Sequence, residues 1–91
     1  MKRLLALLLL APLLGCGGGD IPVPASGPGR QEAICAIAFS QWFGISSHDV
    51  RVTGRTARGE NAVIGLAAAE PRVVGQCEIT PGDAIAAMVV E

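Results

Sequence analysis

The feature that most limits what this chain can fold into is a glycine- and proline-rich stretch, residues 17–30, which reads GGGDIPVPASGPGR. Glycine is too free in conformation, and proline lacks a backbone N–H, for such a stretch to sustain a helix or a sheet. It predicts a flexible tether with a root-mean-square span of about 20 Å, or about 45 Å when drawn out as polyproline II. Residues 31–91 remain to build a folded domain.

Residues 1–15, which precede the tether, have the pattern of a signal peptide. The chain starts with positive charge at Lys2 and Arg3, and Leu4–Leu14 is an apolar run interrupted only by Pro12. As a helix this run reaches about 17 Å, well short of the ~30 Å hydrocarbon core of a bilayer. The segment is therefore predicted to direct export and to be removed, rather than to span a membrane.

The signal peptide runs into Leu13-Leu14-Gly15-Cys16, which resembles the lipobox of bacterial lipoproteins at all four positions. The resemblance implies transfer of a diacylglyceryl group to the Cys16 sulfur, cleavage between Gly15 and Cys16, and acylation of the new amino terminus. Two or more acyl chains, at about 0.8 kcal/mol per buried methylene, anchor a protein stably in a membrane. The alternative is an ordinary secretory signal followed by a cysteine that carries no lipid.

Residue 17 bears on which membrane would hold the anchor. In lipoproteins of enteric-type bacteria, an Asp directly after the lipidated cysteine retains the product at the inner membrane, whereas this chain has Gly17. The resemblance therefore implies the outer membrane, with the domain facing the periplasm, rather than the inner membrane.

The charge of the mature part argues against nucleic-acid binding. From Cys16 onward there are five arginines against eight acidic residues, a formal net charge of −3. Nucleic-acid binders need positive charge gathered on one face. Four of the arginines are instead interleaved with Glu60 and Glu70, a pattern typical of a solvated surface. These four are Arg51, Arg55, Arg58 and Arg72.

A helix is predicted over Gln31–Phe43, with Gly44 as its stop. Four of its residues recur at i, i+3, i+4 and i+7 and so share one face. They are Cys35, Ala38, Phe39 and Trp42. Trp42, the only tryptophan of the chain, is predicted to be the main core anchor, with a platform for a ligand as the alternative.

After a polar turn at residues 46–49, the pattern changes to the alternation that is typical of β-strands. Strands are predicted over residues 50–53, 62–67 and 73–79. In the last of these, the odd positions share one face. The sequence of residues 80–83, Thr-Pro-Gly-Asp, predicts a type II turn with Pro and Gly at its centre. Residues 84–90 are predicted to form a strand paired with the preceding one, with a second helix as the alternative.

One helix followed by three to four strands with short connections predicts an α+β fold, in which the helix packs on an antiparallel β-meander. A domain of about sixty residues buries little surface, and such domains often carry a covalent staple. With Cys16 assigned to lipid by its resemblance, two thiols remain, both predicted to point inward in an exported protein. That assignment implies a disulfide between Cys35 and Cys77, with two buried free thiols as the alternative.

Several features of the mature domain occur together in one known family. They are an Ala-x-x-Ile-Ala rhythm approximated by Ala33, Ile37 and Ala38, then Gly44, a strand over 49–52, and a hairpin over 77–82. In this combination the domain resembles the small PepSY-like domains of exported bacterial proteins, although the aromatic and Asp-rich strand positions of that family are largely missing. Such domains are associated with binding and inhibiting partners outside the cytoplasm, so the resemblance implies a binding module.

No residue pattern predicts a catalytic, metal or cofactor site. The only histidine, His48, lies among Ser46, Ser47 and Asp49. Neighbours in sequence cannot form a Ser-His-Asp relay, because its side chains must converge from separate segments. They are interpreted as a polar cluster that stabilises a turn. One histidine with scattered carboxylates does not supply three or four metal ligands, and the glycines of residues 15–19 open no helix, as a phosphate-binding loop would.

Glu32, Glu78 or Asp83 could act as a general acid only in a cleft, which about sixty residues can scarcely build. An enzyme is therefore not expected. The sequence predicts a lipid-anchored envelope protein whose domain binds or inhibits a protein partner, or contributes to envelope structure. A small-ligand carrier or sensor that uses apolar space beneath Trp42 is the alternative.

Overall fold

The computed structural model describes residues 19–91, so the predicted signal peptide, the lipobox with Cys16 and the first residues of the tether lie outside the described part. The described chain forms one α-helix, α3 (Arg30–Phe43), one short 3-10 helix, η1 (Ser47–Asp49), and a sheet. The strands are β1 (Val50–Arg58), β2 (Asn61–Ala69), β3 (Arg72–Ile79) and β4 (Ile85–Val90). No helix in residues 19–91 is both long enough and apolar enough to cross a membrane.

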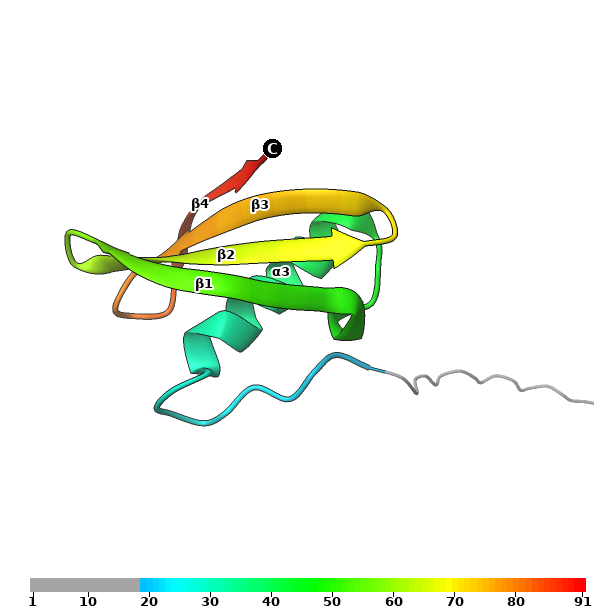
Figure 1. Ribbon diagram of the computed structural model, residues 1–91. Helices are drawn as coiled ribbons and strands as arrows, with labels where there is room; N and C mark the ends of the chain where they lie inside the picture. Colours follow the sequence, from blue (N-terminus) through cyan, green and yellow to red (C-terminus); the bar gives the residue numbers. More distant parts are fainter. Residues whose placement is uncertain (1–18) are drawn as a thin grey trace, which may run out of the picture.

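The sheet is an antiparallel meander with the strand order β1-β2-β3-β4, and α3 lies across one of its faces (Figure 1). This arrangement confirms the predicted α+β fold, and residues 85–90 form a strand rather than a helix. The β1–β2 and β3–β4 turns lie together at one end of the domain, here called the hairpin end. The opposite end, with η1 and the β2–β3 turn, is called the η1 end.

The core lies between α3 and the two central strands. As predicted, the odd positions of β3 face inward, with Gly75, Cys77 and Ile79 buried and Val73 partly buried. The even positions of β2 face the same way, since Ile64 pairs with Cys77 across the two strands. The largest fully buried apolar side chains are those of Phe39, Ile64, Leu66 and Ile79.

Gly44 ends α3, as predicted. It has a left-handed backbone with φ of 67°, and its N–H donates to the carbonyl of Gln41 at 3.3 Å. The next residue, Ile45, donates to the carbonyl of Ser40 at 3.0 Å. Such bonds satisfy the last carbonyls of a helix, and glycine adopts the required conformation without steric strain. The chain can then turn directly into η1.

The predicted buried face of the helix is only partly right, because Cys35 and Phe39 are buried, Ala38 is half-buried and Ser40 is buried as well. Trp42 is 63% exposed and is not the core anchor. The buried residues of α3 are Ala33, Cys35, Ala36, Phe39 and Ser40. At 3.6 residues per turn, Trp42 lies about 90° round the helix from the centre of the last four of them. Phe39 takes the anchoring place because β3 has Gly75 beneath it, where an added Cβ would come within 2.8 Å of the Phe39 ring.

The β3–β4 turn also differs from its prediction. A type II turn requires positive φ at its second central residue, but Gly82 does not have it, and Asp83 has a φ of 68°. Asp83 N–H donates to Thr80 O at 2.9 Å, and Thr80 N–H donates to Ala84 O at 2.8 Å. This is the pattern of a three-residue hairpin loop in which a left-handed residue follows a β-turn. Aspartate is among the few residues that tolerate this conformation.

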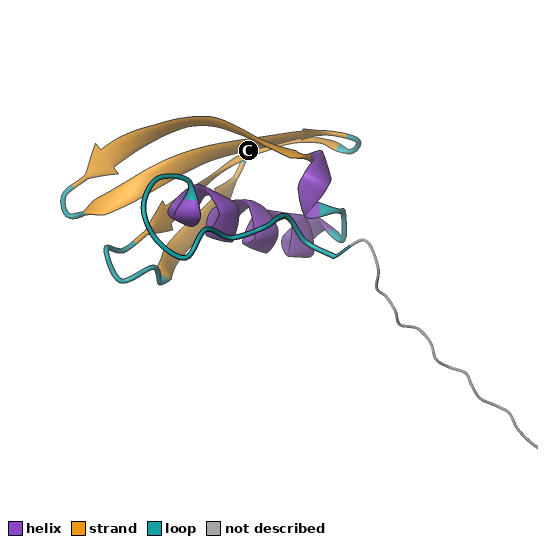
Figure 2. Cartoon of the chain, turned by 90° about the horizontal axis from the view of Figure 1, so that it is seen from below, coloured by secondary structure: helices purple, strands orange, loops and turns teal. Residues whose placement is uncertain are grey.

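The predicted tether is not free of the domain over its described residues. From Gly19 to Gly29 the chain runs along α3 on the side away from the sheet (Figures 1 and 2). Ile21 packs partly buried against the hydrophobic core. The domain therefore has three layers at this point, namely the sheet, the helix and the extended segment.

Candidate functional site

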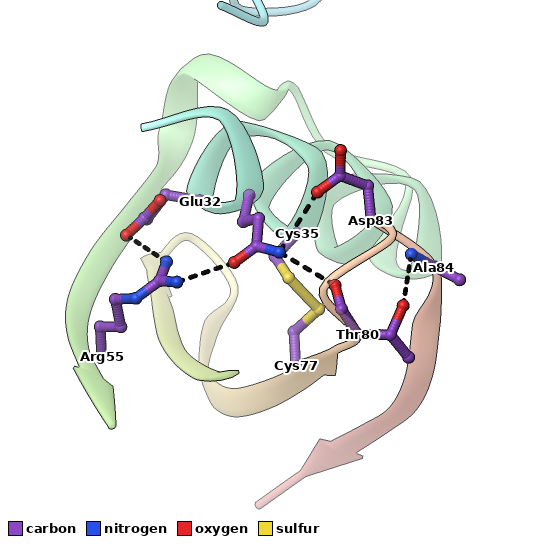
Figure 3. Close-up of a disulfide and its surroundings, with 8 residues drawn as sticks. Glu32, Cys35, Arg55, Cys77, Thr80, Asp83 and Ala84 are labelled. Carbon is purple, nitrogen blue, oxygen red and sulfur yellow. Dashed lines mark hydrogen bonds and ion pairs between the residues drawn. A yellow bond between two sulfur atoms is a disulfide. The ribbon is translucent and has the colours of Figure 1, made fainter. Parts of the chain in front are cut away.

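Polar side chains gather at the hairpin end, where the first turn of α3 meets the β3–β4 turn (Figure 3). Arg30 Nε donates to Asp83 Oδ2 at 2.9 Å, and Gln31 Nε2 donates to Asp83 Oδ1 at 3.2 Å and to Thr80 O at 2.9 Å. The hydrogen bond from Arg30, followed by that from Gln31, lowers the pKa of the Asp83 carboxyl below its ordinary value. This carboxyl is thereby held in its ionised form and is a poor general acid.

Gln31 connects this turn to the first strand. Arg55 of β1 donates through Nη2 to Gln31 Oε1 at 2.8 Å and through Nη1 to Glu32 Oε2 at 3.0 Å. The amide of Gln31 is therefore used in both directions, as acceptor from Arg55 and as donor to the β3–β4 turn. We call Arg30, Gln31, Glu32, Arg55 and Asp83 the polar cluster.

An open depression of about 550 Å³ lies beside the polar cluster and is walled on its other side by residues 25–28. Its polar groups are mostly bonded to one another. Glu32 Oε1 is the one buried side-chain oxygen or nitrogen without a hydrogen-bond partner in residues 19–91. Cys35, close to this region, is fully buried in a disulfide and is therefore not a free thiol. The depression is open to solvent and lies between the polar cluster and the extended segment.

The structure separates the three carboxylates considered as general acids. Glu32 and Asp83 both belong to the polar cluster, where each accepts from an arginine. Glu78 lies on the face of the sheet away from α3, where it accepts from Asn61 Nδ2 at 2.7 Å and pairs with Arg58 at 3.8 Å. They do not converge on a common point.

The polar turn around His48 has the structural role predicted for it, and its partners lie in the tether. Ser47 is buried, and its hydroxyl accepts from Ile21 N–H at 2.9 Å and donates to Asp20 Oδ1 at 3.1 Å. His48 Nε2 lies 3.2 Å from the carbonyl oxygen of Gly19. Ser46 Oγ accepts from His48 N–H at 3.2 Å, which caps η1. We call these contacts the Ser47 junction.

The predicted disulfide is present between Cys35 and Cys77, which join α3 to β3 (Figure 3). Both cysteines are fully buried. Within the part of the chain that the structure describes, no group of three or more His, Cys, Asp or Glu side chains is placed to hold a metal ion.

The last strand presents an uncharged edge. Residues 85–90, IAAMVV, contain no charge and no proline, and Ile85, Val89 and Val90 are 39%, 55% and 37% exposed. The helix packs against β1, β2 and β3 and reaches little of β4. Glu91 N–H donates to Val74 O at 2.9 Å. In an antiparallel pair every second residue bonds to the neighbouring strand, so every second residue before Glu91 also bonds to β3. The backbone groups of Met88 and Val90 then point outward from the sheet.

The opposite edge is protected in the way that natural sheets protect edges. Strand β1 carries three arginines at its exposed positions, Arg51, Arg55 and Arg58. A register shift between Val52 and Gly54 interrupts its pairing with β2. Of the two edges in the described sheet, β4 is therefore the one that could accept another extended segment by strand addition.

Comparison of the chain with protein-family models, with curated proteins and with solved structures finds no match. The lipobox and PepSY-like resemblances therefore stay predictions from the sequence.

Sequence reasoning missed three of these features, namely the Ser47 junction, the polar cluster and the β4 edge. The junction at Ser47 joins residues 26 positions apart, and the polar cluster joins residues about fifty apart. Nothing in the local pattern pairs such residues. The β4 edge had a usable signal, because six consecutive residues without charge at the edge of a meander are unusual for a protected strand.

Proposed function

We propose that this chain is a lipid-anchored protein of the bacterial cell envelope, held in the membrane through Cys16, whose domain binds or inhibits another envelope protein without catalysis. The membrane is thus one partner, reached through the lipid, and an envelope protein is the other. The outer membrane, facing the periplasm, is the proposed location because Gly17 follows the cysteine.

The anchor is supported by the Leu13–Cys16 pattern and by the way the other cysteines are used. Cys35 and Cys77 bond to each other, so Cys16 is the one cysteine left for another role. Disulfides persist in oxidising compartments such as the periplasm and are rare in the cytosol. A stapled domain behind an export signal is consistent with an envelope location.

The observation that carries the binding role is the uncharged β4 edge. A partner segment that is extended and apolar would gain backbone hydrogen bonds to Met88 and Val90 and side-chain contacts with Ile85 and Val89. At the hairpin end, by contrast, the polar side chains bond to one another in the polar cluster. Of the two sheet edges, β4 is the one that carries no charged side chain.

The small-ligand alternative loses the feature that suggested it. It depended on apolar space beneath Trp42, but the Trp42 side chain is mostly exposed, and Phe39 fills the space above the sheet. A depression of about 550 Å³ lies at the other end of the domain, beside the polar cluster, and is lined mainly by polar and charged residues and by residues 25–28. We therefore retain the protein-binding role.

The anchor is tested by intact mass and membrane fractionation. Wild type should carry the lipid mass on a chain that begins at Cys16 and should sediment with membranes. The Cys16→Ser variant should lack that mass and should not be processed at the same bond. A wild type that fractionates as soluble and unmodified would contradict the anchor.

The binding role is tested by crosslinking in membranes with matched edge variants. Lysine on an edge strand blocks strand addition, so Val89→Lys should abolish recovery of a stoichiometric crosslinked protein. Thr56→Lys introduces the same residue at an exposed position of β1 and should leave recovery unchanged. Equal recovery from both variants, loss with both variants, or no stoichiometric partner in wild type would contradict binding at the β4 edge.

A further inference from the structure

The Ser47 junction fixes the chain close to the residue that is proposed to carry lipid. Ile21 is held through its backbone N–H by the buried Ser47 hydroxyl, and its side chain packs against the core. Gly19 is held through its carbonyl by His48. Asp20 accepts from the Ser47 hydroxyl, so three consecutive residues of the predicted tether are bonded to η1.

The length of chain outside this junction is short. Three residue steps separate Gly19 from Cys16, and a fully extended chain covers at most about 11 Å in that distance. A free tether of fourteen residues would instead span about 20 Å on average and let the domain turn in any direction. With lipid on Cys16, the η1 end is the part of the domain nearest the bilayer. The hairpin end lies roughly 25 Å further away, the length of the nine-residue strand β2.

The η1 end also carries the one tryptophan of the chain, and it is exposed. Trp42 is in the last turn of α3, two residues before Gly44, and 63% of its surface is accessible. Folding does not account for it, because Phe39 already fills the adjacent core. Tryptophan is enriched where membranes meet water, since its ring is apolar and its indole N–H seeks a polar partner.

Two arginines at this end, on the face of the sheet away from α3, are suited to the same surroundings. Arg51 and Arg72 flank one shallow depression lined by Ala67–Ala69 and Val74. The three ion pairs in the described residues all lie toward the hairpin end, and neither arginine takes part in them. An arginine can lay its apolar stem along such a surface and place its guanidinium among phosphates. Asp49 and Glu70 lie nearby in the chain, so net charge does not drive the contact.

We propose that the η1 end is a membrane-docking surface, in which the short tether brings Trp42 into the headgroup region of the lipid that anchors Cys16. This rests on the proposed lipidation and goes beyond it, because an anchor alone does not determine which face of the domain meets the membrane. The hairpin end and the β4 edge then face the aqueous compartment.

The test uses Trp42 as its own probe. Lipidated full-length protein is reconstituted into vesicles of phosphatidylethanolamine with a minor share of phosphatidylglycerol, with or without bromine on the acyl carbons nearest the headgroup. We expect a shift of the emission to shorter wavelength on reconstitution and loss of most of the emission with brominated lipid. Raising the salt concentration should change little, because the attraction is not one of net charge.

The control variant moves the probe to the far end of the domain. Trp42→Phe combined with Glu60→Trp places the tryptophan in the β1–β2 turn, and both positions are exposed, so folding is retained. Its emission should not change with brominated lipid. Equal quenching of both proteins, or no quenching of a lipidated wild type, would overturn the docking surface and leave the anchor standing. A wild type without the lipid mass would overturn both.

Discussion

The two ends of the domain are held together by different kinds of contact. The hairpin end has the Cys35–Cys77 disulfide nearby and all three ion pairs found in residues 19–91. The η1 end has one buried serine hydroxyl that gathers the incoming chain, and it leaves Trp42 exposed. Exposed ion pairs contribute about 0–1 kcal/mol each, so the end with more polar contacts is not thereby the more stable one. The difference indicates that burial and covalent linkage determine the stability of the domain. The exposed side chains of the η1 end are then available to contact another surface.

Removal of the disulfide should have the largest effect. The two cysteines are 42 positions apart, and opening a loop of that length lowers the free energy of unfolding by about 4 kcal/mol in the chain-entropy account. Urea unfolding of Cys35→Ala/Cys77→Ala against oxidised wild type measures it. Wild type should also gain two hydrogens in mass on reduction. If the free energy of unfolding fell by less than about 1 kcal/mol, the polar contacts would be enough to hold the hairpin end without the disulfide. That result would contradict the comparison.

The two large aromatic residues of α3 should respond very differently. Phe39 is fully buried against Gly75, and truncation to alanine leaves a cavity that costs about 3 kcal/mol. Trp42 is exposed, so Trp42→Ala should change the free energy of unfolding by no more than about 0.5 kcal/mol. Urea unfolding of the two variants and of wild type measures both changes in the free energy of unfolding. Similar costs for both would show that the η1 end depends on Trp42 for its fold.

The Ser47 junction should contribute less to the free energy of unfolding, and its effect should be limited to the η1 end. Ser47→Ala leaves the Ile21 N–H without its acceptor, at a cost of about 1–2 kcal/mol. Hydrogen exchange should show that the Ile21 amide loses protection while the amides of β2 and β3 keep theirs. Ser46→Ala, which removes only the cap of η1, serves as the control and should leave Ile21 protected. Unchanged protection in Ser47→Ala would mean that the tether is held elsewhere.

The fold could be predicted from the sequence because its signals are local. Alternation in β3 placed Cys77 inward, Gly44 ended the helix, and the pairing of Cys35 with Cys77 followed from the resemblance that assigns Cys16 to lipid. The rotation of α3 could not be predicted in the same way. Apolar residues occur on nearly every side of this helix, so several faces fit the period. The choice is made by packing against the sheet, where Gly75 leaves room for the ring of Phe39.

The candidate surfaces were harder to predict, for a related reason. The polar cluster and the Ser47 junction are contacts between side chains and distant loops, and polar residues carry no periodic signal that names their partners. Gln31 gave no indication that its amide would bond to both Arg55 and Thr80. The exposure of β4 depends on how far α3 extends across the sheet, which is a property of packing and not of the strand itself.

The smallest effect is expected at Asp83, where the contribution of the ion pair can be read from its pH dependence. The hydrogen bonds from Arg30 and Gln31 lower its pKa in the folded protein below the ordinary value of 3.8. A group of this kind adds stability that is present above its unfolded pKa and is lost as the pH falls through the lower, folded pKa. Wild type should therefore exceed Asp83→Asn in stability above about pH 5, and the difference should narrow below pH 3.8.

Asparagine is a close control at this position, because it tolerates the left-handed backbone of residue 83 about as well as aspartate does. Urea midpoints of the two proteins between neutral and acidic pH give the difference directly, and the other titrating groups are common to both. The effect should be small because about a third of each side chain of the pair is open to solvent, which screens the attraction. A difference that stays constant across the acidic range would show that the Asp83 charge adds nothing. The hairpin end would then owe its stability to the disulfide, the core and the remaining polar contacts, and the contrast with the η1 end would lose the Arg30–Asp83 pair.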